Sequence, residues 1–153
     1  MLCWYLNSKA GIYFDKIPSL CVRYYVPSMT KEEKKSVEKY PFVCKKDLKV
    51  CLKDIKKNKE YNFCIPKGYC YDGASVPRFF WRLIGPNTDN RFLIPALIHD
   101  VLCENHEFVN NNRSFSTNVF NALLESSNVG SFKRFCMKNS VAVFQTLFCT
   151  WND

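Results

Sequence analysis

Hydrophobic and polar residues alternate along the first half of the chain with the period of two that is typical of β-strands. Between residues 11 and 27, aromatic and β-branched residues alternate with polar ones, and a Pro-Ser pair divides this stretch into two predicted strands that could form a hairpin. The same alternation predicts further strands at about 48–55, 61–65 and 69–71. Turns that are rich in lysine, or that contain proline and glycine, separate these strands.

Helical spacing appears once in the first half and throughout the second half. Thr30 and Glu33 form the Thr-x-x-Glu pattern of a capping box, which predicts a helix from Lys31 to about Lys39. Later helices are predicted at about 77–84, at about 90–103, from Ser116 or Thr117 onward, and from Ser131 onward. We expect Pro95 to lie in the first turn of its helix, because a proline further inside removes a backbone hydrogen bond.

The order of these elements predicts an α+β fold. A β-rich amino-terminal half with an antiparallel sheet is followed by three to four packed helices. The chain has 153 residues, of which 47% are hydrophobic, and this is enough to form one packed core. We therefore expect a single domain over residues 1–153.

Positive charge widens the range of partners to acidic ones. The formal net charge is +8, and residues 31–60 contain 11 lysines against 6 acidic residues. This segment is a candidate for binding nucleic acid, nucleotides or anionic lipid. It lacks the arginines and interleaved aromatic residues of recognition surfaces, so a solvated lysine-rich surface is the favoured interpretation.

The nine cysteines do not form the pattern of a zinc ribbon or a disulfide scaffold, because no CxxC motif occurs and an odd number cannot pair completely within one chain. The amino terminus lacks a basic region before its short apolar run, so we expect no signal peptide. No apolar run approaches the ~20 residues that span a bilayer. These features predict a cytoplasmic protein with reduced thiols and no membrane span.

The segment from Asp72 to Pro77 has two interpretations. In the structural one, Asp72 accepts backbone N–H groups of a turn and Ser75 caps the next helix, an arrangement that is much commoner than an active site. In the functional one, the same N–H groups face an anion or oxyanion, and Ser75 or Asp72 reacts. Arg78 and Arg82, one helical turn apart, could add an anion-binding patch.

His99 and Cys103 are four residues apart on a predicted helix, so both side chains could bind one zinc ion. Two further ligands would be needed, and Cys64, Cys70 and Asp72 are of suitable type. The alternative is a buried, hydrogen-bonded histidine beside a core thiol. Asp100 is expected to be a partly buried carboxylate that needs a partner. We expect it to converge with Asp72, Ser75 and His99, because polar clusters within apolar sequence normally satisfy one another.

Two blocks of the sequence resemble a known family. They are IPKGYCYDGASVPR at residues 65–78 and ALIHDVLC at residues 96–103. Both are similar to the signature VPxGFxTDxASVPR…HDxL of domain of unknown function 1353, an uncharacterised family found mostly in phages, prophages and their bacterial hosts. The resemblance covers about residues 61–144. It places four residues at the family's polar signature positions: Asp72, Ser75, His99 and Asp100.

A third block of this family, R-x-x-A-D-x-x-F, is only partly present. Arg113 and Phe120 align with it, but Thr117 stands at the position of the family's Asp, with Asn118 beside it. Threonine cannot supply a metal-binding carboxylate, so this departure lowers the expectation of a hydrolytic metal site. The family has no agreed activity, so the resemblance implies a phage or prophage setting, in the host cytoplasm or the virion, rather than a reaction.

Three functions follow as expectations, in decreasing order. The first is a phage-type or prophage-type accessory protein that acts as a non-enzymatic binding module for a host factor, a virion component or a small anionic ligand. The second is a small hydrolase that uses Asp72, Ser75, His99 and Asp100, with zinc as a candidate cofactor. The third is nucleic-acid binding through Lys31 to Lys59. An enzyme should show a pocket with His99 partly open to solvent, and a binding module should show His99 sealed and an exposed patch elsewhere.

Overall fold

The computed structural model describes residues 2–73 and 90–148 of the chain. In this part, a four-stranded antiparallel sheet has the order β1-β2-β5-β6. Its strands are β1 (Leu2–Leu6), β2 (Ala10–Phe14), β5 (Leu48–Asp54) and β6 (Lys59–Ile65). Strand β6 alternates between buried and exposed residues over most of its length, as expected for a sheet with one face on the core.

A second, three-stranded antiparallel sheet has the order β3-β4-β7. Its strands are β3 (Leu20–Val22), β4 (Phe42–Cys44) and β7 (Cys70–Tyr71). The hairpin that the sequence allowed between the two strands of residues 11–27 does not form. Strand β2 has β1 on one side and β5 on the other, so it has no free edge for β3, which pairs with β4 instead.

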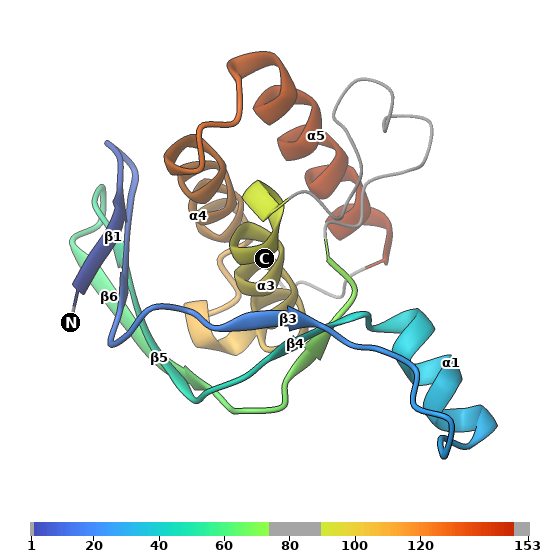
Figure 1. The fold of residues 1–153 in the computed structure, drawn as a ribbon. Helices are drawn as coiled ribbons and strands as arrows, with labels where there is room; N and C mark the ends of the chain where they lie inside the picture. Colours follow the sequence, from blue (N-terminus) through green and yellow to red (C-terminus); the bar gives the residue numbers. More distant parts are fainter. Residues whose placement is uncertain (1, 74–89, 149–153) are drawn as a thin grey trace.

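Along the chain the helices follow the strands, apart from α1, which lies between β3 and β4. In space α1 projects from the rest of the fold (Figure 1). They are α1 (Lys31–Lys39), α3 (Asn90–Glu104), the short 3₁₀ helix η2 (His106–Val109), α4 (Arg113–Ser126) and α5 (Ser131–Phe148). The α+β class and the order of a β-rich half before packed helices are confirmed. Among the described helices, none is both long enough and apolar enough to cross a membrane.

The ends of α1 and α5 agree with the sequence patterns. Glu33 donates its backbone N–H to the Thr30 hydroxyl at 3.2 Å, and the Glu33 carboxylate accepts the Thr30 N–H at 2.7 Å, so the capping box is complete. Helix α5 begins at the predicted Ser131. Local capping chemistry was therefore sufficient to place the start of α1, and the helical spacing of the sequence placed the start of α5.

Two expectations about the other helices are wrong. Pro95 lies inside α3, beyond its first turn. Helix α4 begins at Arg113 rather than at Ser116 or Thr117. The reason is Asn112, whose side-chain oxygen accepts the Phe115 N–H at 3.0 Å and so caps the helix one turn earlier than predicted.

One hydrophobic core joins the large sheet to the helices. Helix α4 lies between this sheet and α5, and it also packs against α3 (Figure 1). Its central position explains why most of its residues are buried, including several polar ones. Residues buried in this core include Ile12 and Leu52 of the sheet, Leu97 and Leu102 of α3, Val119 and Leu123 of α4, and Met137 of α5.

Candidate functional site

Tyr71, the last residue of β7, anchors the small sheet on helix α3. Its ring packs against Phe42, with the ring centroids 5.5 Å apart, and its hydroxyl donates a hydrogen bond to the Leu93 carbonyl at 3.2 Å. Burial, followed by the nearby charge of Asp100, raises the pKa of Tyr71 well above its usual range, so the phenol stays a donor. This contact holds the next residue, Asp72, beside α3.

Asp72 and Asp100 form a hydrogen-bonded pair of carboxyl groups between the end of β7 and α3. The backbone N–H of Asp72 also donates to the Asp100 carboxyl group. Asp72 is exposed, whereas the side chain of Asp100 is only 15% exposed. Burial raises the pKa of Asp100 well above its ordinary value, and the hydrogen bond and charge of Asp72 add to this effect. Asp100 therefore keeps its proton to a higher pH than an ordinary aspartate does.

His99 is sealed inside the protein, with 5% of its surface exposed. Its ring packs against Phe120, with the centroids 5.3 Å apart, and its Nε2 atom lies 3.4 Å from the Cys103 Sγ atom. Its Nδ1 atom lies 3.4 Å from an Asp100 oxygen. Burial lowers the pKa of His99 to about 4, against the opposing charge of Asp72. The imidazole is therefore neutral at physiological pH.

Of the four residues expected to converge, the structure brings together Asp72, His99 and Asp100. Ser75, the fourth, lies outside the described residues, and so do Arg78 and Arg82, the proposed anion-binding pair. The carboxyl pair can share a proton, which is the arrangement that lets one carboxyl act as an acid and its neighbour as a base. Because Asp72 is exposed and His99 is buried, only the carboxyl side of this cluster faces solvent.

The zinc hypothesis keeps two of its ligands in position. His99 and Cys103 are in contact on one face of α3. Within residues 2–73 and 90–148, however, no group of three or more His, Cys, Asp or Glu side chains is arranged to hold a metal ion. Cys64 and Cys70, the other candidates, are free thiols. A zinc site at this position stays a prediction.

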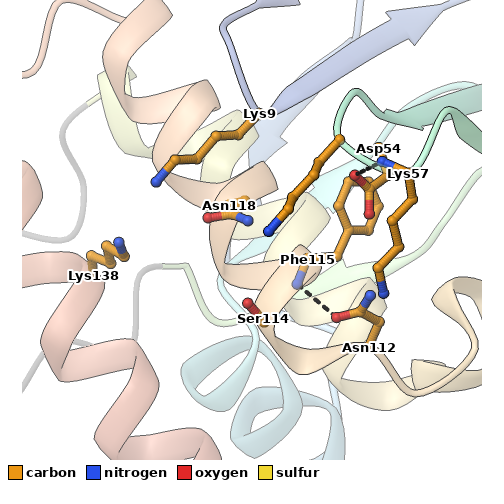
Figure 2. Close-up of a pocket in the computed structure, with 9 residues that line it drawn as sticks. Lys9, Asp54, Lys57, Asn112, Ser114, Phe115, Asn118 and Lys138 are labelled. Carbon is orange, nitrogen blue, oxygen red and sulfur yellow. Dashed lines mark hydrogen bonds between the residues drawn. The ribbon is translucent and has the colours of Figure 1, made fainter.

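A separate site lies at the start of helix α4, where four lysine side chains surround a cavity of about 430 Å³. Figure 2 shows Lys9, Lys57 and Lys138 reaching toward this cavity from different parts of the fold. We call it the lysine cavity, and its lining consists of Lys9, Asp54, Lys56, Lys57, Asn112, Ser114, Phe115, Asn118 and Lys138. Its size falls within the ~300–1,000 Å³ of small-molecule sites.

Two tight turns bring three of these lysines to α4. In the β1–β2 turn, the Asn7 side chain accepts the backbone N–H of Lys9 at 2.8 Å. In the β5–β6 turn, the Asp54 carboxylate accepts the backbone N–H of Lys57 at 3.1 Å. Asn58 supplies the left-handed conformation of that turn, with φ of 49°. Both turns lie at the same end of the large sheet, because β2 and β5 pair antiparallel with Ala10 opposite Asp54.

A second cavity of about 330 Å³ adjoins the first, between the start of α4 and α5. The two cavities share Asn112, Ser114, Asn118 and Lys138. Arg113 and Thr117 also line the second one, and Arg113 donates a hydrogen bond to the Thr146 hydroxyl of α5 at 2.8 Å.

Thr117, at the position of the resembled family's Asp, uses its hydroxyl to donate to the Arg113 carbonyl at 3.1 Å. This threonine therefore bonds back onto its own helix.

The sequence pattern indicated only part of the lysine cavity. Lys56 and Lys57 belong to the basic segment that was singled out, but Lys9 and Lys138 stand at opposite ends of the chain with no local signal. Other lysines of the segment lie elsewhere, for example on α1, where glutamates alternate with them. Turn-forming residues at 7–9 and 54–58 indicate two turns, but only the strand pairing shows that these turns lie side by side.

Comparison with known families supports the resemblance that the signature blocks carry. The family described as "Protein of unknown function (DUF1353)" matches residues 48–141, which is more than half of the chain. The chain belongs to this family. The matched region begins at residue 48, upstream of the start at about residue 61 that the signature blocks had suggested. It includes Asp72, His99 and Asp100, together with three lysines of the cavity, whereas Lys9 lies outside it.

A curated relative has no assigned activity either. An uncharacterised protein named y4jT from Sinorhizobium fredii is 42% identical over 40 residues, which are 26% of this chain and 12% of that protein. The chain therefore corresponds to a small part of this relative. No solved structure matches the chain.

Proposed function

We propose that this member of the DUF1353 family is a non-enzymatic binding module whose ligand is a small anion held in the lysine cavity. The observation that carries the proposal is the convergence of four lysines from three separate parts of the chain on one cavity with a single carboxylate. Several ammonium groups around one cavity give it a positive potential, and a bound anion is attracted by that potential. The start of α4 adds a partial positive charge at the same place.

The state of His99 supports binding over catalysis. A hydrolase that used this histidine would need it partly open to solvent, and the side chain is buried and neutral instead. A sealed histidine together with an exposed basic site elsewhere is the combination expected of a binding module. In the phage or prophage setting that the family resemblance implies, such a module would act as an accessory protein.

The test is binding of pyrophosphate to the full chain, measured by isothermal titration calorimetry. The double variant Lys56→Ala/Lys57→Ala removes two charges from the cavity, and Lys31→Ala/Lys35→Ala removes two charges from exposed positions on α1 as a matched control. We expect the first variant to weaken binding at least tenfold, which is about 1.4 kcal/mol, and the control to change it less than twofold. Equal weakening by both variants would show a non-specific charge effect and would contradict the proposal.

A hydrolase is the second candidate, and the hydrogen-bonded pair of Asp72 and Asp100 favours it. Two carboxyl groups that share a hydrogen bond could act as general acid and base. The test is turnover of phosphoester and peptide substrates by the wild type, Asp72→Asn and Asp100→Asn. Activity that both variants abolish would establish the hydrolase. Activity that is absent from the wild type, or that survives in both variants, would remove this candidate.

A further inference from the structure

The charge of the lysine cavity exceeds what one phosphate group balances. Four ammonium groups line it, and the one carboxylate, Asp54, is buried and accepts the backbone N–H of Lys57 within its own turn. A phosphate monoanion or dianion carries at most about two negative charges near neutral pH. A ligand that neutralises all four lysines therefore needs more than one phosphate group.

The lysines are also spread around the cavity rather than gathered at one point. Lys9 comes from the β1–β2 turn, Lys56 and Lys57 come from the β5–β6 turn, and Lys138 reaches in from α5 on the other side (Figure 2). The second cavity adjoins the first beside the same turns of α4, is lined by Lys138 and Ala142 of α5, and shares Lys138 with the first. An elongated anion matches this layout better than a compact one.

Uncharged donors line the floor between the lysines. Ser114 and Asn118 are one helical turn apart on the same face of α4, and both belong to the two cavities. A serine hydroxyl and an asparagine amide can donate to phosphate oxygens. The elongated anion would therefore contact these two side chains as it passes from the first cavity to the second.

The lining offers little to a nucleic-acid base. Single-stranded nucleic acids are held largely by stacking of their bases on exposed aromatic rings. Among the described residues around the cavity, Phe115 is the aromatic one, and it is only 2% exposed. Recognition therefore falls on phosphate groups.

We propose that the lysine cavity binds a linear oligophosphate, namely the tandem phosphates of inorganic tripolyphosphate or of a nucleoside triphosphate, extended past the start of α4 toward the second cavity and α5. This inference rests on the proposed function and names the ligand class of the same site. Lys138 holds the far end of the chain of phosphates, while Lys9, Lys56 and Lys57 hold the near end.

The experiment compares ligands of increasing phosphate number on the full chain by isothermal titration calorimetry. Orthophosphate, pyrophosphate, tripolyphosphate, a nucleoside triphosphate and a single-stranded oligonucleotide are titrated at one fixed salt concentration. We expect affinity to rise at least tenfold from orthophosphate to tripolyphosphate. Lys138→Ala should weaken tripolyphosphate about tenfold and orthophosphate less than about threefold, because each charged contact to phosphate is worth roughly a factor of ten.

The controls separate this inference from the proposed function. Lys138→Arg keeps the charge and should keep the affinity for tripolyphosphate, and Lys31→Ala should leave it unchanged. Orthophosphate binding as tight as tripolyphosphate, and weakened by Lys56→Ala/Lys57→Ala, would overturn the oligophosphate inference and keep the anion-binding function. Failure of every phosphate ligand to bind would overturn both.

Two ligands distinguish the possible sources and the alternative. Equal affinity for tripolyphosphate and the nucleoside triphosphate supports recognition of the phosphates alone, and tighter binding of the nucleotide supports the nucleoside triphosphate as the ligand. An oligonucleotide that binds more tightly than tripolyphosphate and is weakened by Lys138→Ala would overturn the inference in favour of nucleic acid.

Discussion

Replacing Asp100 by Asn should change the pH dependence of stability in a direction that the buried carboxyl pair dictates. Asp100 has a raised pKa in the folded protein, so the folded state holds a proton that the unfolded state releases above pH 3.8. Folding then requires proton uptake at higher pH. The free energy of unfolding of the wild type therefore loses about 1.4 kcal/mol per pH unit from this group, from pH 3.8 up to its folded pKa.

His99 acts in the opposite direction over part of this range. Its folded pKa of about 4 lies below the ordinary 6.5, so protonation between these values favours the unfolded state, and stability rises with pH there. The two slopes offset each other over the part of this range that lies below the folded pKa of Asp100. Above pH 6.5 the His99 contribution is constant, so any further change in stability from this cluster comes from the carboxyl pair.

The Asp100→Asn variant removes the pH dependence that comes from Asp100 and keeps the hydrogen bonds to Asp72. Its amide N–H can donate to Asp72 as the protonated carboxyl does, and its carbonyl can accept the Asp72 backbone N–H. The variant should therefore gain stability relative to the wild type by about 1.4 kcal/mol per pH unit, from pH 3.8 up to the folded pKa of Asp100. For a chain of this size, that corresponds to about 3–6 °C in Tm per pH unit.

The assay is urea unfolding of both proteins at pH 4, 5, 6, 7 and 8, with the difference in free energy plotted against pH. Groups that titrate equally in both proteins, such as Asp15, cancel in this difference. Asp100→Ala is the control for a lost contact, because it leaves the Asp72 N–H without its acceptor and should be less stable than Asp100→Asn at every pH. A difference between the wild type and Asp100→Asn that is flat with pH, or that falls, would refute the buried protonated pair.

Three further predictions concern the fold. Thr30→Ala should cost about 1 kcal/mol by chemical denaturation, because it removes the complete capping box of α1; no loss would mean that the cap adds nothing to global stability. Gly68→Ala should cost about 1–2 kcal/mol, since φ is 89° and no atom lies within 4 Å of an added Cβ, and Gly68→Asn should recover part of the loss; equal stability of Gly68→Ala and the wild type would contradict this. Phe120→Ala should cost about 3–5 kcal/mol and expose His99, whereas Phe135→Ala at a 64% exposed position should cost under about 0.5 kcal/mol; similar losses would contradict the assigned core.

Local chemistry in the sequence was enough for the parts of the fold that depend on near neighbours. The capping box of α1, the start of α5 and the alternating burial of β6 depend on residues a few positions apart. Helix α4 begins before the predicted Ser116 or Thr117 because Asn112 caps it further upstream. Pro95 lies inside α3 rather than in its first turn, because burial of the helix in the core offsets the backbone hydrogen bond that proline cannot make.

The candidate site divides in the same way. The signature blocks placed Asp72, His99 and Asp100 in one cluster from sequence, because isolated polar groups within apolar segments need one another. The pairing of two carboxyl groups and the neutral state of His99 depend on how deeply each is buried, and burial is set by packing between α3, α4 and β7.

The amino-acid sequence by itself determined the α+β class, the family and the residues of the carboxyl and histidine cluster. Tertiary structure alone decided the lysine cavity, because Lys9 and Lys138 are separated by most of the chain and meet only when the β1–β2 and β5–β6 turns pack beside α4 and α5. The physical reason is range. Capping, alternation and turn preferences act over a few residues, whereas convergence of charge depends on strand order and helix packing, which bring together parts of the chain that share no local pattern.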